Sequence, residues 1–459
     1  MSLVILLLLS SFFLVNFGHQ NITQATISSQ QLALVDTLEF YTDKDKRLND
    51  LLASDNRSAW LHLAKLYAKE HRFLAYQIGD YYLSIKDSKS AVLWLQESVR
   101  HNDKRANFSL ANYYYRNRQY QKVSALLLPI IEDERALVQL SKLALRDGDI
   151  NFINEFEVAL SAIKNQHFYD ELKSYSVFDT GEKKITRQCD IDVQLFATNL
   201  STLRHAKLLV DQFKEKALAK YICLYSPKYM PKQQLNCQHS PNEKISCKAN
   251  AWSSRDDISS RYIGVIVEQG VANVDNGIMY LDKQDDINVL THELTHFLGF
   301  IDEYSLPVNH SKCQSAQKDT FSHNVVVLTE NYQGKRAEIR ARVLAQLPWA
   351  HLIKSSTPIL TRVNNSWKLT TPKPFADEVG VFPAKTCDNK ANKQAFKPIV
   401  SRTKLEYFEL ALPNSYIDIL KLAPKKYLMP SYHFNVSRDL AEQGEYKKAR
   451  EILQTTLFD

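Results

Sequence analysis

The segment HELTHFLGFIDEY, residues 292–304, constrains the fold of this chain more than any other part of the sequence. Apolar residues at helical spacing occupy one face of this region: Ile287, Leu290, Leu294, Phe297 and Leu298. A helix turns by about 100° per residue, so His292 and His296 lie within about 40° of each other on the opposite face, with Glu293 about 60° beyond. Gly299 is the residue type that most often ends a helix. The pattern predicts a helix that ends just before Gly299 and carries two imidazoles and a carboxylate on its polar face.

Two histidines one turn apart on a helix form a zinc-binding arrangement. Both rings can ligate the same ion, and a glutamate directly after the first histidine can reach a water molecule at that ion. We therefore expect His292 and His296 to bind one catalytic zinc ion. Glu293 is then the general base that removes a proton from the attacking water. The alternative is a helix on which both histidines are ordinary buried residues with satisfied hydrogen bonds.

A catalytic zinc ion takes three ligands from the protein, so a third ligand is required. Gly299 permits a left-handed turn that folds the chain back under the helix, which brings Asp302 within reach. Asp302 is therefore the expected third ligand. Glu303, the next residue, is an alternative, and Glu338, which lies far downstream, is another.

The sequence between about residue 189 and the motif alternates between strand and helix patterns. It predicts a strand at residues 190–198, a helix at residues 203–221 and a strand at residues 261–268. The tripeptide Asp275-Asn276-Gly277 tolerates positive φ and leads into another strand, which ends at Leu281. An α/β domain is the fold class that this order predicts. Either aspartate before the motif helix, Asp285 or Asp286, can cap its first turn.

Residues 25–165 have a helical pattern with few glycines and prolines. A small residue beside a large one recurs in four places, at Leu63-Ala64, Ile78-Gly79, Leu110-Ala111 and Leu140-Ser141. Turn patterns occur around Arg118 and Gly148, and a similar one at Gly444 indicates a helix pair in residues 434–459 that can extend the same array. These features resemble tetratricopeptide-type (TPR) helical repeats, which implies either a concave surface for a protein partner or a structural scaffold.

The extended motif, HExxHxxGxxD, resembles that of the metzincin zinc metallopeptidases, and the form HELTHFLGFIDEY looks most like the IgA-peptidase-like family. Looser similarities are Pro348-Trp349 and the run Val379-Gly380-Val381-Phe382. The resemblance covers residues 189–432 and does not include the helical repeats. It implies hydrolysis of peptide bonds in a peptide or protein substrate.

The same resemblance implies two further features of the site. Metzincins place a methionine in a turn beneath the metal, and Met429 is the candidate here, although its distance from the motif implies additional structure between about residues 311 and 423. Tyr432 follows it and could approach the metal. Metzincins also present an edge strand to an extended substrate, which points to residues 277–281. The alternation of Ile278 and Tyr280 fits a buried strand inside the sheet equally well.

The cysteines and the first residues of the chain indicate export. All six cysteines lie between Cys189 and Cys387 without a CxxC pair, which argues against a four-cysteine zinc cluster. Their even number suggests three disulfides of undetermined pairing; free thiols in a reducing compartment are the alternative. The apolar run at the start is short for a membrane span of about 20 residues. Residues 1–20 are therefore expected to be a signal peptide or, alternatively, an N-terminal membrane anchor.

The charged residues give no indication of a nucleic-acid partner. The formal charge of +7 arises from 58 basic and 51 acidic side chains, without a block of like charges. With 44% hydrophobic and 11% aromatic residues, the chain can form substantial cores. It is therefore expected to fold into more than one globular domain.

These observations predict an α+β multidomain protein. Its expected parts are an α-helical, TPR-like repeat domain at residues 25–165, an α/β metzincin-like zinc domain at residues 185–433 and a helical tail at residues 434–459. The expected function is that of a periplasmic or secreted zinc endopeptidase. The alternatives are an interaction protein whose zinc site is catalytically idle, and a zinc hydrolase that acts on a bond other than the peptide bond.

Overall fold

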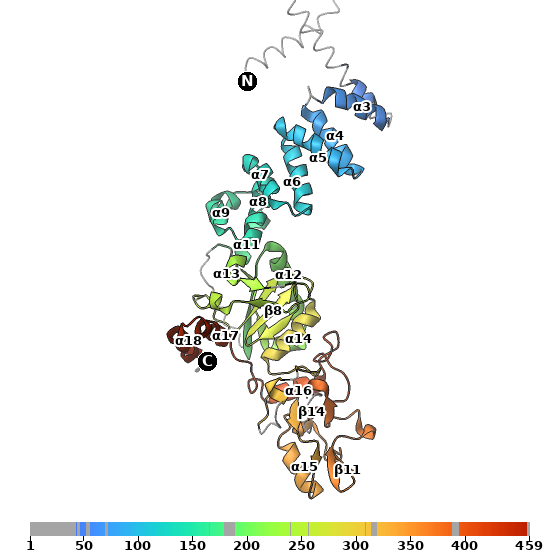
Figure 1. Ribbon diagram of the computed structural model, residues 1–459, viewed down its shortest axis with the longest axis vertical. Coiled ribbons are helices and arrows are strands. Elements are labelled where there is room, and N and C mark those ends of the chain that lie inside the picture. Colours follow the sequence, from blue (N-terminus) through green and yellow to red (C-terminus); the bar gives the residue numbers. More distant parts are fainter. Residues whose placement is uncertain are drawn as a thin grey trace, which may run out of the picture. The chain divides into compact units, whose positions relative to one another are not determined.

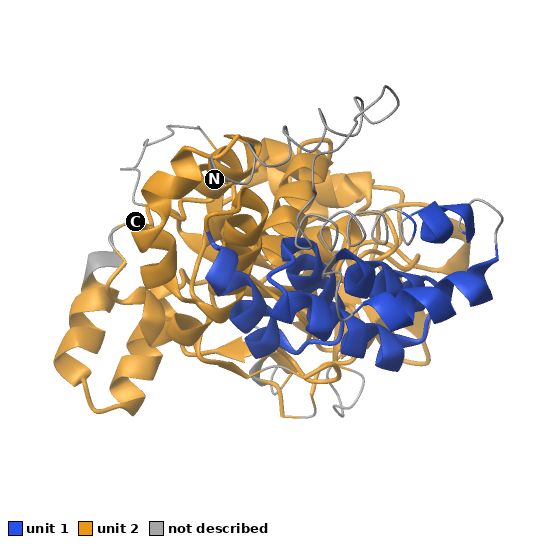
Figure 2. Ribbon diagram, turned by 90° about the horizontal axis from the view of Figure 1, so that it is seen from above, with its two compact units in different colours: residues 1–131 blue, residues 132–459 orange. Residues whose placement is uncertain are grey.

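The computed structural model is a mixed α and β structure, with helices first and sheets later in the chain (Figure 1). It describes residues 43, 46–51, 56–68, 72–164, 166–178, 189–238, 240–255, 257–307, 309–313, 319–387 and 394–456. The chain divides into two compact units, residues 1–131 and residues 132–459 (Figure 2). The expected signal peptide or anchor at residues 1–20 lies outside the described residues. Within them, no helix has both the length and the apolar character that a membrane span requires.

The first unit is built from consecutive helices. They are α3 (Arg57–Tyr67), α4 (Arg72–Ser84), α5 (Ser88–Arg100), α6 (Lys104–Arg116) and α7 (Tyr120–Leu127). The small residues of the sequence pattern lie at the buried helix contacts, where Ala64 and Ala111 are fully enclosed. A Cβ atom at Gly79 would lie 2.6 Å from Cγ of Leu95, so glycine allows α4 and α5 to approach closely.

Four of the helix-to-helix turns, in both units, share one conformation. A residue with positive φ follows the helix at Lys86, Asn102, Arg118 and Gly148. After three of these residues comes an aspartate that caps the next helix, and Asp87, for example, accepts a hydrogen bond from the backbone N–H of Ser90. The chain therefore ends one helix and starts the next within a few residues, as the sequence predicts at Arg118 and Gly148.

Four further helices open the second unit: α8 (Glu134–Asp147), α9 (Ile150–Glu155), α10 (Glu157–Ser161) and α11 (Gln166–Ser174). They are tied to the sheet region of that unit. The hydroxyl of Tyr229 donates to the carbonyl of Leu145 at 2.8 Å, and the guanidinium of Arg204 makes two hydrogen bonds to Glu171. The helical region expected at residues 25–165 is thus divided between the two units.

A six-stranded sheet forms the centre of the second unit. Its strands are β1 (Ile191–Ala197), β2 (Ile222–Leu224), β3 (Lys228–Tyr229), β6 (Tyr262–Val267), β7 (Asn273–Asp275) and β8 (Ile278–Asp282). The order is β2-β1-β6-β8-β7, and β3 pairs with β1. Pairing is parallel except between β7 and β8. Every residue of β6 and β8 is buried, as is usual for parallel strands covered on both faces.

The strands predicted at residues 190–198 and 261–268 are confirmed by β1 and β6. The helix predicted at residues 203–221 is displaced. It is α12 (Leu200–Phe213), which starts earlier because the side chain of Asn199 accepts a hydrogen bond from the N–H of Thr202, and a separate 3-10 turn, η2 (Ala217–Lys220), follows it. The chain leaves the α-helix early enough to enter β2.

The hairpin between β7 and β8 has the two-residue turn that its sequence predicts, because Asn276 (φ 37°) and Gly277 (φ 83°) both adopt positive φ. It also decides between the two alternatives that the sequence leaves open for residues 277–281. Residues 277–281 do not form the edge of the sheet, since β8 lies between β6 and β7. The edge on this side of the sheet is β7, whose three residues are too few to be recognised from a periodic pattern.

Residues 311–423, where additional structure is expected, contain two small antiparallel sheets of orders β10-β12-β11 and β13-β14-β9. Their elements are β9 (Val326–Leu328), β10 (Asn331–Tyr332), α15 (Arg336–Leu344), β11 (Leu360–Val363), β12 (Ser366–Leu369), β13 (Phe382–Ala384), β14 (Gln394–Lys397) and α16 (Asn414–Leu422). The two segments with loose metzincin similarity meet here, because the indole N–H of the buried Trp349 donates to the carbonyl of Gly380 at 2.7 Å.

All six cysteines form disulfides, as the sequence predicts. The pairs are Cys189–Cys223, Cys237–Cys247 and Cys313–Cys387. The second pair joins two short strands, β4 (Cys237–Gln238) and β5 (Ser246–Cys247), which follow the short helix α13 (Lys232–Leu235). Three disulfides suggest that the protein folds in an oxidising environment outside the cytoplasm.

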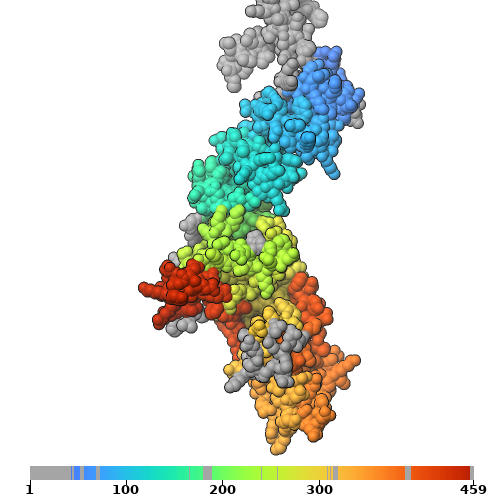
Figure 3. Space-filling view, viewed as in Figure 1, coloured from blue at the N-terminus to red at the C-terminus, as the bar shows by residue number. Residues whose placement is uncertain are grey.

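The C-terminal tail is a helix pair, α17 (His433–Glu442) and α18 (Tyr446–Thr456), joined by the predicted turn at Gly444 (φ 84°). The pair projects from the surface of the second unit in the space-filling view, where it is dark red (Figure 3). Its buried face joins the core of the sheet, in a cluster that includes Trp252, Tyr280 and Val436. The tail is therefore anchored on the sheet of this unit.

Candidate metal centre

The predicted motif helix is α14 (Ile287–Phe297), which directly follows β8 in the second unit (Figure 1). The side chain of Asp286 caps it by accepting hydrogen bonds from the N–H groups of Asn288 and Val289. Asp285, the other capping candidate, instead accepts from the N–H of Asp282. The helix ends where predicted, because Gly299 adopts a left-handed conformation with φ 86°.

The left-handed turn brings the carboxylate of Asp302 to both motif histidines. Its Oδ1 atom lies 3.3 Å from Nε2 of His292 and 3.3 Å from Nε2 of His296. The three candidate ligand atoms all lie within 4.8 Å of one another. In the part of the chain that the structure describes, no other group of three histidine, cysteine or acidic side chains is arranged to hold an ion.

Each imidazole is oriented by a carbonyl group at its other nitrogen. Nδ1 of His292 lies 2.8 Å from the carbonyl oxygen of Lys404, and Nδ1 of His296 lies 3.1 Å from that of Phe300. A carbonyl oxygen can only accept a hydrogen bond, so each Nδ1 carries the hydrogen of the neutral ring. Each Nε2 therefore presents a lone pair toward Asp302. This is the usual arrangement around histidines that bind a metal ion.

The side chains in this cluster fit a cation. Oδ1 of Asp302 is buried and, with both rings neutral, receives no hydrogen bond from the described residues. Two nitrogen lone pairs and one anionic oxygen thus face a shared point without a hydrogen between them. Such an arrangement is unfavourable without a positive charge, because a buried carboxylate oxygen without a partner is costly. A divalent cation bound by all three atoms satisfies it, and two imidazoles with one carboxylate are a ligand set found at catalytic zinc sites.

The pKa values of His296 and Asp302 in the metal-free protein also indicate a site that favours positive charge. Burial lowers the pKa of His296, but the charge of Asp302 outweighs this effect and raises that pKa to about 9. Burial likewise raises the pKa of Asp302, whereas the two imidazoles outweigh burial and hold that pKa well below its usual range. The site therefore attracts positive charge, which can be supplied by a proton or by a metal ion.

Glu293 lies on the same helix and is only 7% exposed. Burial is the main cause that raises its pKa, while the neighbouring His296 and His292 lower it. A bound cation would further favour the ionised carboxylate. Among the described residues, none makes a hydrogen bond or ion pair with the Glu293 carboxylate. It is therefore available to a water molecule or a substrate.

The two alternative third ligands lie elsewhere. Glu303 is fully buried, and its carboxylate binds Lys397 and Thr403 instead of approaching the histidines. Glu338 is exposed on α15, where its carboxylate lies 3.4 Å from Nζ of Lys335. Of the three acidic residues considered from the sequence, Asp302 is the one that the structure brings to both imidazoles.

Residues 427–432 run against the end of the motif helix. The N–H of Met429 donates to the carbonyl of Phe297 at 3.2 Å, and the Tyr262 hydroxyl donates to the carbonyl of Met429 at 2.7 Å. A Cβ atom at Gly299 would lie 2.3 Å from the carbonyl oxygen of Tyr427. The segment that contains the candidate methionine is therefore held directly against the loop that carries Asp302.

Two tyrosines were possible neighbours of the metal ligands, and the structure places one of them away from the ligands and the other beside them. Tyr432 does not reach the metal ligands, since it is buried in the sheet core and its ring stacks on that of His433. Tyr304, in contrast, is close to the cluster. Burial and the negative charges of Asp302 and Glu293 raise the pKa of the Tyr304 hydroxyl far above its usual value. Its place two residues after Asp302 in the motif was the available signal.

The residues that sequence reasoning missed lie far from the motif. Lys404 contributes only its backbone carbonyl to His292, so no pattern of side chains in the sequence could predict this contact. Thr403 and Lys397, which bind Glu303, are likewise distant in sequence and unremarkable in type. These positions become recognisable only when the fold brings them to the motif.

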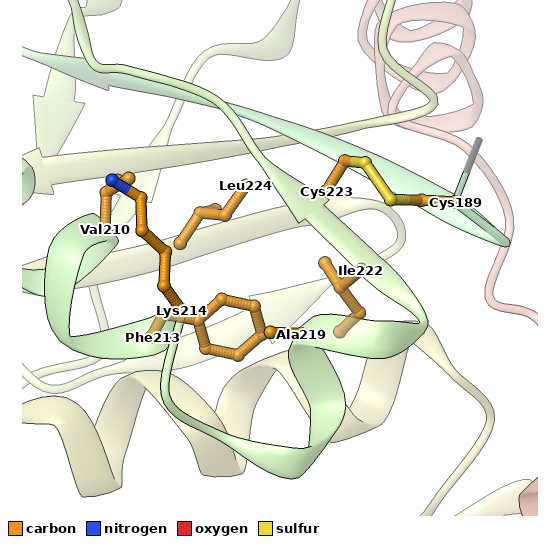
Figure 4. A pocket seen from close by; sticks show the side chains of 8 residues that line it. All are labelled: Cys189, Val210, Phe213, Lys214, Ala219, Ile222, Cys223 and Leu224. Atoms are coloured by element: carbon orange, nitrogen blue, oxygen red, sulfur yellow. A yellow bond between two sulfur atoms is a disulfide. The ribbon is translucent and has the colours of Figure 1, made fainter. Parts of the chain in front are cut away.

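A separate pocket of about 350 Å³ lies beside the disulfide at the start of β1 (Figure 4). It is lined by Cys189, Val210, Phe213, Lys214, Ala219, Ile222, Cys223 and Leu224. None of the candidate metal ligands lines it. The pocket is mainly apolar and has no convergent acidic or histidine side chains, so it is not a second metal site.

Taken residue by residue, the cluster can bind one metal ion and place a buried carboxylate beside it. Comparison with known proteins adds no assignment: no family model, no curated protein and no solved structure matches this chain.

Proposed function

We propose that this protein is an exported zinc-dependent endopeptidase. The single observation that carries the proposal is the convergence of Nε2 of His292, Nε2 of His296 and Oδ1 of Asp302 within 4.8 Å. Glu293, on the same helix, has a carboxylate that none of the described residues engages in a hydrogen bond or ion pair. Two nitrogen ligands and one oxygen ligand with room for water are the protein contribution to a hydrolytic zinc site.

The chain's own residues have distinct tasks in the proposed reaction. When bound, zinc supplies a Lewis acid that polarises the scissile carbonyl and the attacking water. Glu293 removes a proton from that water and delivers it to the leaving amine. The carbonyl groups of Lys404 and Phe300 keep both imidazoles in the orientation that leaves Nε2 free. Because Asp302 is anionic, the centre carries less positive charge than three histidines would give, so proton transfer by Glu293 matters more.

The metzincin resemblance supports peptides as the substrate class. We propose that residues 189–432 form a metzincin-like domain, with Met429 in the turn beside the Asp302 loop. Strand β7 offers the edge to which an extended peptide can add by backbone hydrogen bonds. The edge is already occupied just before β7, where Lys244 forms a parallel bridge with Val271, so only a short stretch remains for a substrate.

The remaining parts of the proposal concern location and partners. Three disulfides support export to the periplasm or the cell exterior. The closely packed helices of residues 57–127 support a TPR-like repeat that docks a protein partner or substrate. Small residues at its helix contacts, such as Gly79 and Ala111, are what such a repeat requires.

The proposal is tested by measuring bound zinc and peptide cleavage on the same preparations. The wild-type protein should contain one zinc ion and cleave members of a broad peptide library, with products identified by mass spectrometry. Glu293→Ala should keep the zinc and lose cleavage by about 100-fold or more, because it removes the general base. Asp302→Ala should lose the zinc, whereas the matched control Glu338→Ala should keep both properties.

Three results would overturn parts of this proposal. Folded wild-type protein that takes up no stoichiometric zinc would refute the metal centre. Turnover retained by Glu293→Ala would refute the role of that residue. Zinc binding without cleavage of any peptide would replace the peptidase with a catalytically idle zinc site or a hydrolase of another bond.

A further inference from the structure

The carboxylate of Glu303 is the most completely bonded acidic group near the candidate metal centre. Its side chain is 0% exposed, and four donors surround it. Lys397 Nζ and the Thr403 hydroxyl both donate to Oε2 at 2.9 Å. The Tyr416 hydroxyl and the side-chain amide of Asn324 donate to Oε1, at 2.5 Å and 3.1 Å. With both oxygens engaged, this carboxylate has no lone pair directed at the histidines.

The partners of Glu303 come from four different parts of the second unit. Lys397 ends β14, Tyr416 lies on α16, Asn324 precedes β9, and Thr403 lies between β14 and α16. Glu303 itself directly follows the ligand Asp302. One buried carboxylate therefore connects the metal-binding loop to the additional structure downstream of it.

The connection through Thr403 leads to the segment that orients His292. The Thr403 hydroxyl donates to the Glu303 carboxylate, and the backbone N–H of Glu303 donates to the carbonyl of Leu405 at 2.9 Å. Between these two residues lies Lys404, whose carbonyl accepts the hydrogen bond from His292. Glu303 thus holds the chain on both sides of Lys404, whose carbonyl group orients the imidazole of His292.

The ligand Asp302 is held from the same direction. Its backbone carbonyl accepts a hydrogen bond from the Thr386 hydroxyl at 2.9 Å, and the N–H of Lys385 donates to the carbonyl of Glu303. The backbone of the Asp302 loop therefore has little freedom. The segments that contact Asp302 and orient His292 therefore both form hydrogen bonds with Glu303.

A buried ion pair is not in itself a stabilising choice. Removing a carboxylate and an ammonium from water costs several kcal/mol each, and well-packed apolar residues often serve stability equally well. A charged network of this kind is instead suited to fixing one geometry, because each of its hydrogen bonds is directional.

We propose that Glu303 is a positioning residue of the metal centre, which sets the orientation of His292 through the segment around Lys404 and holds the loop of Asp302. The inference rests on the proposed metal centre and goes beyond the assignment of its ligands. It gives the additional structure at residues 394–422 a role in metal binding.

The test is a titration of the metal-free full-length protein with zinc alone, followed by cobalt(II) as a spectroscopic probe. Glu303→Gln should weaken zinc binding by about 10- to 100-fold, the range seen when a group that orients a metal ligand is lost. It should also change the visible absorption of the bound cobalt, which depends on ligand geometry. Glu171→Gln is the matched control, since Glu171 is also a largely buried carboxylate bonded to a cation, Arg204, without any link to the metal loop.

A second variant guards against loss of folding in Glu303→Gln. Thr403→Val has nearly the same shape and removes only the hydroxyl that joins Glu303 and the N–H of Leu405. It should weaken zinc binding in the same direction by a smaller factor. Folded variants with zinc affinity within about twofold of wild type and an unchanged cobalt spectrum would overturn the inference. Wild-type protein that binds no zinc would instead refute the proposed centre itself.

Discussion

At the scale of single residues, the candidate site is defined by the placement of hydrogens on two rings. His292 and His296 both use Nδ1 to donate to a carbonyl group, so both present Nε2 to Asp302. A neutral core histidine would need a donor or an acceptor at its second nitrogen as well. Here, with both rings neutral, the second nitrogens face a carboxylate oxygen that has no hydrogen-bond donor among the described residues. The arrangement therefore calls for a positive charge between the three side chains, which a proton on His296 or a bound metal ion supplies.

A second residue-scale feature gives a pH dependence of stability. Burial, followed by the negative charges of Asp282 and Glu293, raises the pKa of Asp285 to about 7 in the folded, metal-free protein. In the unfolded chain this carboxyl ionises near pH 4. Between pH 4 and pH 7 the unfolded state therefore releases a proton that the folded state keeps, and the contribution of Asp285 to stability falls as pH rises.

The variant Asp285→Asn should no longer lose stability at this position as pH rises, because asparagine does not ionise. The amide oxygen can still accept the hydrogen bond from the N–H of Asp282. We expect the variant to match wild type near pH 4 and to be more stable by about 1 kcal/mol at pH 8, a modest value because the carboxyl keeps some contact with solvent. Denaturant unfolding of the metal-free proteins at both pH values measures the difference. An equal stability gap at pH 4 and pH 8 would contradict the prediction.

The sequence was sufficient to nominate the site residues because they lie within a few turns of one another. His292, Glu293 and His296 share one helix face, and the Gly299 turn limits how far away Asp302 can be. The supporting contacts could not be predicted in the same way. Lys404 acts through a backbone carbonyl, and a backbone group leaves no trace in the identity of its side chain.

At the scale of elements, the end of α14 depends on a close approach between backbones. Gly299 and Gly444 both end a helix with nearly the same positive φ, 86° and 84°. A Cβ at Gly299 would meet the carbonyl oxygen of Tyr427 at 2.3 Å, whereas nothing lies within 4 Å of one at Gly444. Alanine at Gly444 would therefore cause backbone strain alone, whereas alanine at Gly299 would cause the same strain and a steric clash.

Gly444→Ala should cost about 1 kcal/mol of unfolding free energy, which is the penalty for placing alanine at positive φ. Gly299→Ala should cost at least about 2 kcal/mol more, and it should also weaken zinc binding because the Asp302 loop must move. Denaturant unfolding and zinc titration of the two variants provide the measurements. Equal effects at the two glycines would show that the contact with residues 427–432 does not matter.

Elements with a strong period or a specific turn were predictable. Strand β1 follows an alternating pattern and β6 a β-branched run, and the β7–β8 turn needs the positive φ that Asn276 and Gly277 tolerate. Short elements were not predictable. Strand β7 has three residues and takes the sheet edge only because β8 pairs with β6 on its other side. The start of α12 was set by a capping interaction of Asn199, which outweighed the apolar period.

At the scale of the whole molecule, metal binding should increase the thermal stability of the second unit and leave that of the first unit unchanged. All candidate ligands and their supporting residues lie within residues 132–459. A ligand that binds only the folded state stabilises it, by about 2.7 kcal/mol when its free concentration is 100 times Kd. Zinc should therefore raise the unfolding temperature of the second unit alone.

Differential scanning calorimetry of the full-length protein, with zinc and with excess chelator, measures this effect. We expect two transitions, of which one moves with zinc and the other stays in place. His292→Ala should make the mobile transition insensitive to zinc. A joint shift of both transitions would contradict the assignment of the metal to the second unit.

The hydrogen bond from His292 to the carbonyl of Lys404 joins residues 112 positions apart in the chain. During synthesis, the histidine helix leaves the ribosome long before the carbonyl group that orients its first ring. A chain that has released only the motif has two imidazoles and no fixed ring orientation. The candidate metal centre can therefore be completed only after the chain has been made as far as Lys404, so its assembly depends on folding of the additional structure downstream of the motif.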